Sequence, residues 1–282
     1  MGAKLYFENE YNSRLDLQSL ETCFYSDLSN LGVEFDGSYI SVGDTFVRDY
    51  LNPKQSELAL GLNFFRPNVY EKIQAVSNFI LMAETLILVY KPDLASGIEY
   101  RREVELQSLV KNTGTSGYIC YTVQLRPLSL FYYKKQTKFI IEASEGEMRY
   151  DFRWAARFND YADRTIAVPG GNHADIAFDL EIFGYTENPK IEVIVNDKVI
   201  YSLTFPLTVE TGEKLIYSSQ DKDLKVIHQD AEGNRKNIFG SFSLEDTVFF
   251  KIPKSGATIR FTADTRVFNT IVFTTYNFFK VV

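Results

Sequence analysis

The sequence predicts a mainly β protein with two domains. We expect an α+β N-terminal domain, in which one helix packs on a sheet, followed by a C-terminal β-sandwich or jelly roll. Three observations lead to this fold class. The 282 residues include 23 Phe and 18 Tyr, residue types that fit a half-buried pleated surface. Apolar residues alternate with polar ones through most of the chain, and only one segment has helical spacing.

The N-terminal half reads as strands around a single helix. Alternation with a period of two predicts strands near residues 58–64, 100–106 and 119–125, and residues 85–90 are apolar on both parities, as in a strand covered on both faces. The helix is expected from about residue 69 to 83, with one apolar stripe formed by Val69, Ile73, Val76 and Ile80. Asn68 is the expected N-cap, with Glu71 completing a capping box.

The second half reads as strands only. Residues 149–158 predict a half-buried strand with one aromatic face, formed by Tyr150, Phe152, Trp154, Ala156 and Phe158. Residues 167–172 form the clearest turn or linker signal. We therefore expect one domain over residues 1–148 and a second over 149–282. Asn196-Asp197 predicts a hairpin turn, and further strands are expected near 176–182, 191–195, 199–205, 215–218, 224–229, 248–252, 258–263 and 267–281.

Composition excludes several classes of protein. The net charge of −7 and a pI near 5.1 argue against direct nucleic-acid binding, which needs a basic surface. The start of the chain does not read as a signal peptide, and the longest apolar stretch, residues 79–90, is too short to span a bilayer. We expect a soluble protein made in a cytoplasm, with no membrane insertion. Cys23 and Cys120 are expected to be separate reduced thiols.

Motifs that carry chemistry are missing from the sequence. It contains neither a nucleophile elbow nor a phosphate-binding glycine loop. His173 and His228 each precede an acid by two places, but no third ligand stands at a metal-binding spacing. Asp175, Asp179 and Glu181 share one parity, which we interpret as the solvated side of a strand, and residues 230–234 as a turn. We expect no catalytic residues, no metal and no cofactor.

The order of elements, together with several short phrases, resembles the distal tail (Dit) proteins of long-tailed phages and prophages of Gram-positive bacteria. The phrases are residues 12–17, the helix and the following strand at 86–90, 184–190, 212–215, 233–234 and 253–259. The resemblance implies an N-terminal belt domain that forms a homo-hexameric ring and an outward-pointing galectin-like sandwich. It further implies a structural, non-enzymatic hub at the virion tail tip, assembled in the host cytoplasm. Its implied partners are the tail tube protein, the tail-tip protein, and receptor-binding or peripheral baseplate proteins.

Two other functions stay open at this point. A carbohydrate-binding module for host-wall saccharide would use aromatic rings as stacking platforms, with Tyr201, Tyr217 and Tyr276 as candidates. An enzyme acting on cell-wall polysaccharide would require two carboxylates that face each other across a cleft. The hub predicts self-association, the module predicts exposed rings, and the enzyme predicts paired acids.

Overall fold

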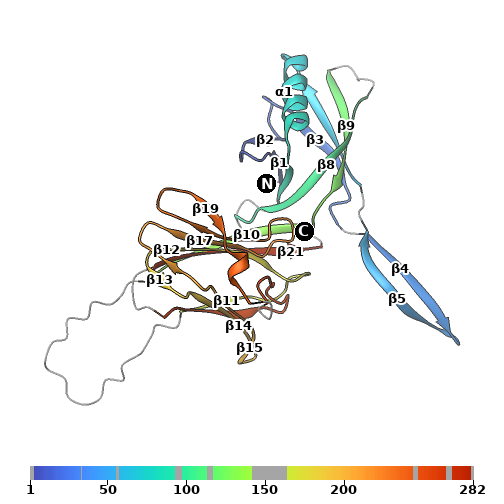
Figure 1. The fold of residues 1–282 in the computed structure, drawn as a ribbon. Coiled ribbons are helices and arrows are strands. Elements are labelled where there is room, and N and C mark those ends of the chain that lie inside the picture. The colour runs from blue at the N-terminus through green and yellow to red at the C-terminus, as the bar shows by residue number, and fades with distance from the viewer. Residues whose placement is uncertain are drawn as a thin grey trace, which may run out of the picture. The chain divides into compact units, whose positions relative to one another are not determined.

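The computed structural model describes residues 3–32, 34–54, 57–92, 97–112, 117–141, 164–243, 247–264 and 269–280 (Figure 1). Strands dominate these residues, and the predicted mainly β fold is confirmed. The aromatic strand expected at 149–158 lies outside the described residues, as does the expected domain boundary at residue 148. Within the described residues, no helix has the length and apolar character needed to cross a membrane.

The chain forms two compact units. Unit 1 comprises residues 1–133 together with 278–282, and unit 2 comprises residues 134–277. The chain therefore leaves unit 1 once and returns to it near its end. The returning residues pack their rings in unit 1: Phe279 stacks on Tyr133 with centroids 5.7 Å apart, and Phe278 lies 6.0 Å from Tyr132.

Unit 1 is built on one antiparallel sheet with the strand order β3-β6-β9-β8-β7-β1-β2. Backbone hydrogen bonds of Leu17 reach Leu5 on one side and Tyr25 on the other, so the sheet curls and its two ends approach each other. The strands are β1 (Lys4–Glu8), β2 (Arg14–Asp16), β3 (Phe24–Ser29), β6 (Leu58–Phe65), β7 (Leu86–Lys91), β8 (Tyr100–Lys111) and β9 (Tyr118–Pro127).

Helix α1 (Val69–Met82) packs its predicted apolar stripe into the core of unit 1. Ile73, Val76 and Ile80 are buried there, so the predicted helix is confirmed. The predicted capping box is wrong. Asn68 is the N-cap residue, but its backbone is left-handed (φ 59°, ψ 39°) and its side chain makes no cap hydrogen bond. A capping side chain normally needs an extended backbone to reach the first-turn amides.

An ion-pair network ties three strands of unit 1 together. Glu8 on β1 is 1% exposed and accepts hydrogen bonds from Arg14 Nε (2.8 Å) and Arg101 Nη1 (2.6 Å). Arg14 also forms a two-bond pair with Glu99, at 3.0 and 2.7 Å. These hydrogen bonds hold the pKa of Glu99 below its ordinary value, despite the opposing effect of burial.

Unit 2 is a β-sandwich, as predicted. One antiparallel sheet has the order β10-β21-β12-β17-β18-β19, and the other has the order β11-β20-β14-β15. The first sheet contains β10 (Phe131–Ile141), β12 (Ala177–Phe183), β17 (Lys214–Ser218), β18 (Lys225–Gln229), β19 (Arg235–Asn237) and β21 (Asn269–Phe279). The second contains β11 (Arg164–Val168), β14 (Lys190–Val195), β15 (Lys198–Thr204) and β20 (Ala257–Thr262). The short pair β13 (Thr186–Glu187) and β16 (Thr208–Val209) and the 3-10 turn η1 (Phe239–Ser241) complete the described elements of unit 2.

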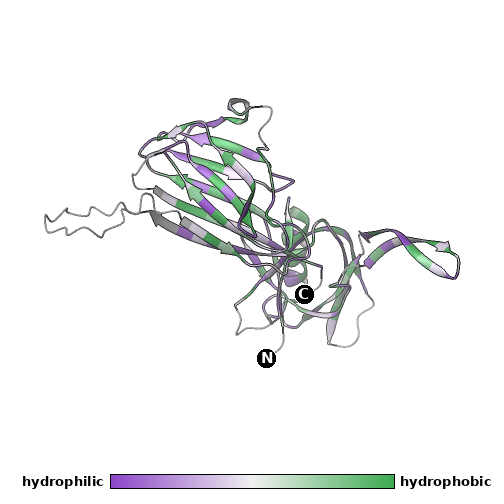
Figure 2. Ribbon diagram, turned by 90° about the horizontal axis from the view of Figure 1, so that it is seen from below, coloured by the Kyte–Doolittle hydropathy of each residue, from purple (hydrophilic) through white to green (hydrophobic). Residues whose placement is uncertain are grey.

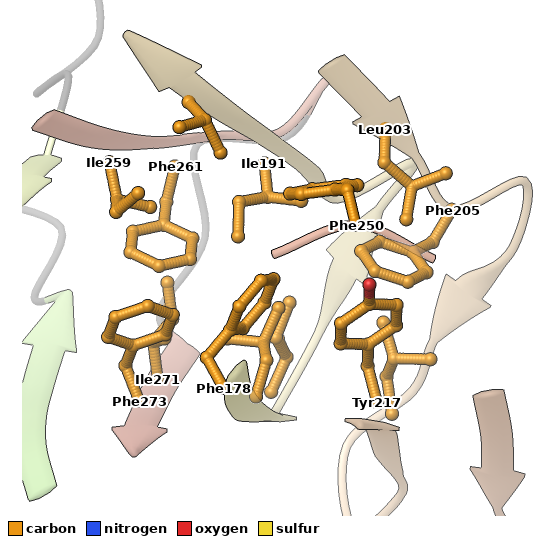
Figure 3. Packing of buried hydrophobic residues seen from close by; sticks show 14 of the residues in the cluster. Phe178, Ile191, Leu203, Phe205, Tyr217, Phe250, Ile259, Phe261, Ile271 and Phe273 are labelled. Carbon is orange, nitrogen blue, oxygen red and sulfur yellow. The ribbon is translucent and has the colours of Figure 1, made fainter. Parts of the chain in front are cut away.

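The core of the sandwich combines aliphatic side chains with a cluster of aromatic rings from both sheets (Figure 3). Phe178 lies at its centre, with ring centroids 5.2 Å from Tyr217 and 5.3 Å from Phe273. Offset and tilted ring pairs of this kind add stability beyond the burial of apolar area. Part of the high Phe and Tyr content therefore serves to fill this core.

Two local predictions have different outcomes in unit 2. The hairpin turn between β14 and β15 is confirmed, because Asn196 (φ 49°) and Asp197 (φ 61°) are both left-handed, as a two-residue hairpin turn requires. The strand expected at 248–252 is wrong. Val248, Phe250 and Ile252 do alternate into the core, but the backbone there makes one isolated bridge, between Ile252 and Ile176. The same alternation therefore arises without a strand ladder.

Replacing Glu8 with Gln should destabilise unit 1 by about 3 kcal/mol, because two guanidinium groups lose the buried charge that compensates them. Chemical denaturation followed by circular dichroism measures this change. The control is Glu105→Gln on β8, where the side chain is exposed, and it should change stability by no more than about 0.5 kcal/mol. Equal effects of the two substitutions would contradict the structural role of the network.

Acid should weaken unit 1 through Glu99. Its folded-state pKa lies below its ordinary value, so its stabilising contribution is complete above the ordinary pKa. That contribution is lost as the pH falls through the folded-state pKa. Comparing the pH dependence of unfolding for the wild type and Glu99→Gln tests this expectation. The difference between the two proteins should shrink on acidification, and a constant difference would contradict it.

Candidate assembly surface

One hairpin of unit 1 contributes no described residue to either hydrophobic core. Strands β4 (Glu34–Val42) and β5 (Thr45–Lys54) pair only with each other among the described residues, and form a separate two-stranded sheet. Gly43, with φ 61°, and Asp44 form the turn. Figure 1 shows this hairpin, which we call the arm, as a ribbon without a third strand. None of its described side chains is buried.

The arm carries a large apolar surface. Eight of its large apolar side chains are between 37% and 76% exposed, namely Phe35, Tyr39, Ile40, Val42, Phe46, Val47, Tyr50 and Leu51. Hydrophobic segments are visible along the arm in Figure 2. Monomeric proteins seldom expose large continuous apolar areas, and such areas generally mark sites of protein association. A two-stranded hairpin is also only marginally stable by itself in water.

Both faces of the arm carry apolar side chains near its tip. The strand register pairs Ser41 with Phe46 on one face and Ile40 with Val47 on the other. Side chains of directly paired residues lie on the same face of a sheet, and successive pairs alternate between the two faces. A strand pair with one solvated face would have polar residues on that face. Ser41 and Arg48 do lie on the face of Phe46 and Tyr39, so one face of the tip is mostly apolar and the other is mixed, and both offer apolar side chains to a partner.

Sequence reasoning did not single out this hairpin. The signal that could have identified it is Gly43-Asp44, a two-residue hairpin sequence between segments rich in aromatic and β-branched residues. The adjacent apolar pairs Tyr39-Ile40 and Phe46-Val47 hide the alternation of period two, because both faces of the arm carry apolar side chains.

The three tyrosines proposed as stacking platforms have different surroundings in unit 2. Tyr217 is fully buried, and its hydroxyl donates to the carbonyl of Val248 at 3.1 Å. Tyr276 is 7% exposed, and its hydroxyl donates to Asp179 Oδ2 at 2.5 Å. Tyr201 is half-buried and stacks on Phe250 at 5.0 Å. Since stacking requires an open ring face, Tyr217 offers none to a saccharide, and the rings are not brought together on one exposed surface.

Asp179, His228 and Asp230 make local contacts in unit 2. Asp179 accepts hydrogen bonds from Gln220, at 3.0 and 3.1 Å, in addition to Tyr276. His228 lies 2.8 Å from Glu213, whose pKa is lowered first by the backbone amide of Glu210 and then by His228. Asp230 accepts the backbone amides of Glu232 and Asn234, as expected for a turn. Over the described part of the chain, no group of three or more His, Cys, Asp or Glu side chains could hold a metal ion.

Tyr217→Phe should destabilise unit 2 by about 1–3 kcal/mol, since it leaves the carbonyl of Val248 without its donor. Burial raises the pKa of Tyr217 above its ordinary value, so the ring should also resist ionisation at alkaline pH. Thermal unfolding and ultraviolet titration check the two statements. The matched control is Tyr70→Phe, where the hydroxyl belongs to a 71% exposed side chain. A Tyr217 hydroxyl that titrates normally would contradict its buried placement.

Comparisons with known proteins agree with this geometry. Residues 4–128 match the family model of the distal tail protein, N-terminal domain. A chain from the structure of the phage P2 baseplate in its activated conformation with Ca superposes with a TM-score of 0.69, at 12% identity, over 100% of both chains. The crystal structure of SPP1 Dit (gp 19.1) superposes with a TM-score of 0.59, at 13% identity, over 96% of this chain and 98% of that one. No curated protein matches in sequence. The predicted resemblance is therefore confirmed: the chain has the fold of these baseplate and Dit structures throughout, and its residues 4–128 match the model of the distal tail protein N-terminal domain.

Proposed function

We propose that this protein is a structural hub of a phage tail tip, in which six copies close into a ring through their N-terminal units. The ring joins the tail tube protein to the tail-tip protein, and unit 2 faces receptor-binding or peripheral baseplate proteins. The chain acts by assembly rather than by catalysis. The family match over residues 4–128 and the likeness to the P2 baseplate and SPP1 Dit structures support a role of this kind.

The arm is the observation that carries the proposal. Burying eight apolar side chains that are now exposed would contribute on the order of 10 kcal/mol before the entropic cost of association is subtracted. That magnitude is enough to hold copies together if the arm of one copy packs on the next. Each copy then both donates an arm and receives one, which is a head-to-tail contact, and head-to-tail contacts produce closed rings when the rotation fits.

The contacts in unit 2 support a non-catalytic role. A retaining or inverting glycosidase needs two carboxyl groups that flank the bond that it cleaves from opposite sides. Asp179 and Glu181 instead stand two residues apart on the same strand, β12, where Asp179 accepts hydrogen bonds from Gln220 and Tyr276 and Glu181 lies 3.9 Å from Lys214. These acids therefore stabilise the outer surface of the sheet formed by β12, β17 and β21.

Light scattering over a range of concentrations tests the proposal. We expect a species with about six times the mass of the chain, which is 32.4 kDa. The double substitution of Phe46 and Val47 by Ser should raise the protein concentration that is needed for assembly by at least about tenfold. This change corresponds to a loss of about 1.4 kcal/mol of association free energy. The thermal stability of this variant should stay close to that of the wild type, because both side chains are exposed, at 76% and 54%.

The matched control is the double substitution of Val199 and Ile200 by Ser on β15. These two side chains are also adjacent, apolar and exposed, at 47% and 42%, but they belong to unit 2. The control protein should assemble like the wild type. A strictly monomeric wild type at high concentration, or equal loss of assembly in the two double variants, would count against the arm as the ring contact.

A further inference from the structure

A buried cation lies at the root of the arm. Arg102 on β8 is 3% exposed. The strand register places it opposite Leu88, and it shares a parity with Val104, so its position belongs to the core-facing side of the sheet. Both neighbours are buried, at 0% and 2% exposed. A guanidinium therefore occupies a position at which the pattern of the strand calls for an apolar side chain.

No carboxylate of the described residues forms an ion pair with Arg102. Its Nε donates to the carbonyl of Ser129 at 2.9 Å, its Nη1 donates to the carbonyl of Gly32 at 3.4 Å, and its guanidinium lies 5.0 Å from the ring centroid of Phe131. Burial without an acidic partner lowers the pKa of Arg102 to about 10. A buried charge without an ionic partner costs stability, and an apolar residue of similar size is often neutral or better at such a place.

The two carbonyls that Arg102 binds belong to irregular backbone. Ser129 lies in the loop between β9 and β10, and Gly32 precedes β4, the first strand of the arm. The guanidinium thus joins the entry of the arm to the body of unit 1. A second cation contacts the same root, since Lys280 Nζ lies 5.1 Å from the ring centroid of Phe35. The two ends of the arm are also joined, because Asn30 Nδ2 donates to the carbonyl of Glu57 at 2.8 Å.

We propose that Arg102 is a positioning residue, which fixes the direction of the arm relative to the body of unit 1, with Lys280 as a secondary contact. Stability alone does not account for a guanidinium at a core-facing position, whereas binding two irregular carbonyls does. A fixed direction matters for ring closure, because a head-to-tail contact closes only at one rotation per subunit. That last consequence rests on the proposed function, but the positioning itself does not.

Spin labels measure the direction of the arm. One label is attached at Asp44→Cys in the turn of the arm, and the other at Gln74→Cys on the exposed side of α1. The background carries Cys120→Ser, while Cys23 stays, because it is 1% exposed and burial raises its thiol pKa to about 12. The labelled full chain is diluted into excess unlabelled protein, so that distances within one copy are recorded by double electron–electron resonance.

Arg102→Met should broaden the distance distribution by about twofold or more, whatever the sign of the change in melting temperature, because relief of the buried charge opposes the loss of the hydrogen bonds to two carbonyls. The control is Arg126→Met on β9, which should leave the distribution unchanged. An unchanged distribution in Arg102→Met overturns the proposal, and so does a lowered melting temperature without broadening, since that result would make Arg102 a stabilising residue only.

Variants at the surface keep the test decisive if Arg102→Met fails to fold. Phe35 is 44% exposed, so Phe35→Leu and Lys280→Met should both fold. Each removes the cation–ring contact, and each should broaden the distribution to a smaller degree. If neither variant broadens the distance distribution, the role of Lys280 is overturned. If Arg102→Met cannot be made, the same result overturns the proposal as a whole.

Ring assembly is the second measurement. Arg102→Met should require about tenfold more protein to form rings. Broadening with unchanged assembly would overturn the link between the direction of the arm and ring closure, while the positioning role stands. A wild type that forms no ring would remove the proposed function, and the label distances would still decide whether Arg102 positions the arm.

Discussion

Every antiparallel strand pair presents two faces to its surroundings, and each apolar face has to be covered. Unit 1 meets this constraint with helix α1, whose apolar stripe joins Leu60, Leu62 and the other core residues of the curled sheet. Unit 2 meets it by laying two sheets against each other over a core rich in Phe and Tyr. The arm has neither a helix nor a second sheet over it among the described residues. Its apolar side chains therefore stay exposed, and another molecule could cover them.

The constraint also explains why the acidic composition is not the main clue to function. The net charge of −7 keeps copies of the chain apart at long range. At contact, however, the tip of the arm presents aromatic and β-branched side chains, whose attraction acts over a short range and does not depend on charge. Repulsion at a distance combined with apolar contact is compatible with an assembly that forms only when the arm fits its receiving surface.

Much of the fold could be predicted because the periods of two and 3.6 are physical consequences of burying one face. The stripe of Ile73, Val76 and Ile80 identified α1, and the two left-handed residues Asn196 and Asp197 identified a hairpin. Alternation failed as a guide to hydrogen bonding at Val248–Ile252, where side chains alternate into the core without a ladder. At the arm, alternation failed to reveal a strand pair that does form, because apolar side chains lie on both faces and hide the period of two. The burial of Tyr217 follows from the same alternation, because Tyr217 shares a parity with Leu215, which places its ring on the buried face. The carbonyl partners of Arg102 come from segments far apart in sequence, so no local pattern could have indicated them.

The return of the chain to unit 1 has a consequence for how the protein is made. Phe278 and Phe279 supply rings against Tyr132, Tyr133 and Tyr100, although nearly all of the rest of unit 1 is synthesised before unit 2. On a ribosome the N-terminal unit is therefore the first to begin folding and cannot be completed until unit 2 has been translated. Until then the rings of Tyr100, Tyr132 and Tyr133 lack the contacts that Phe278 and Phe279 supply. The order of translation, as much as the final contacts, therefore sets when the N-terminal unit can complete its fold.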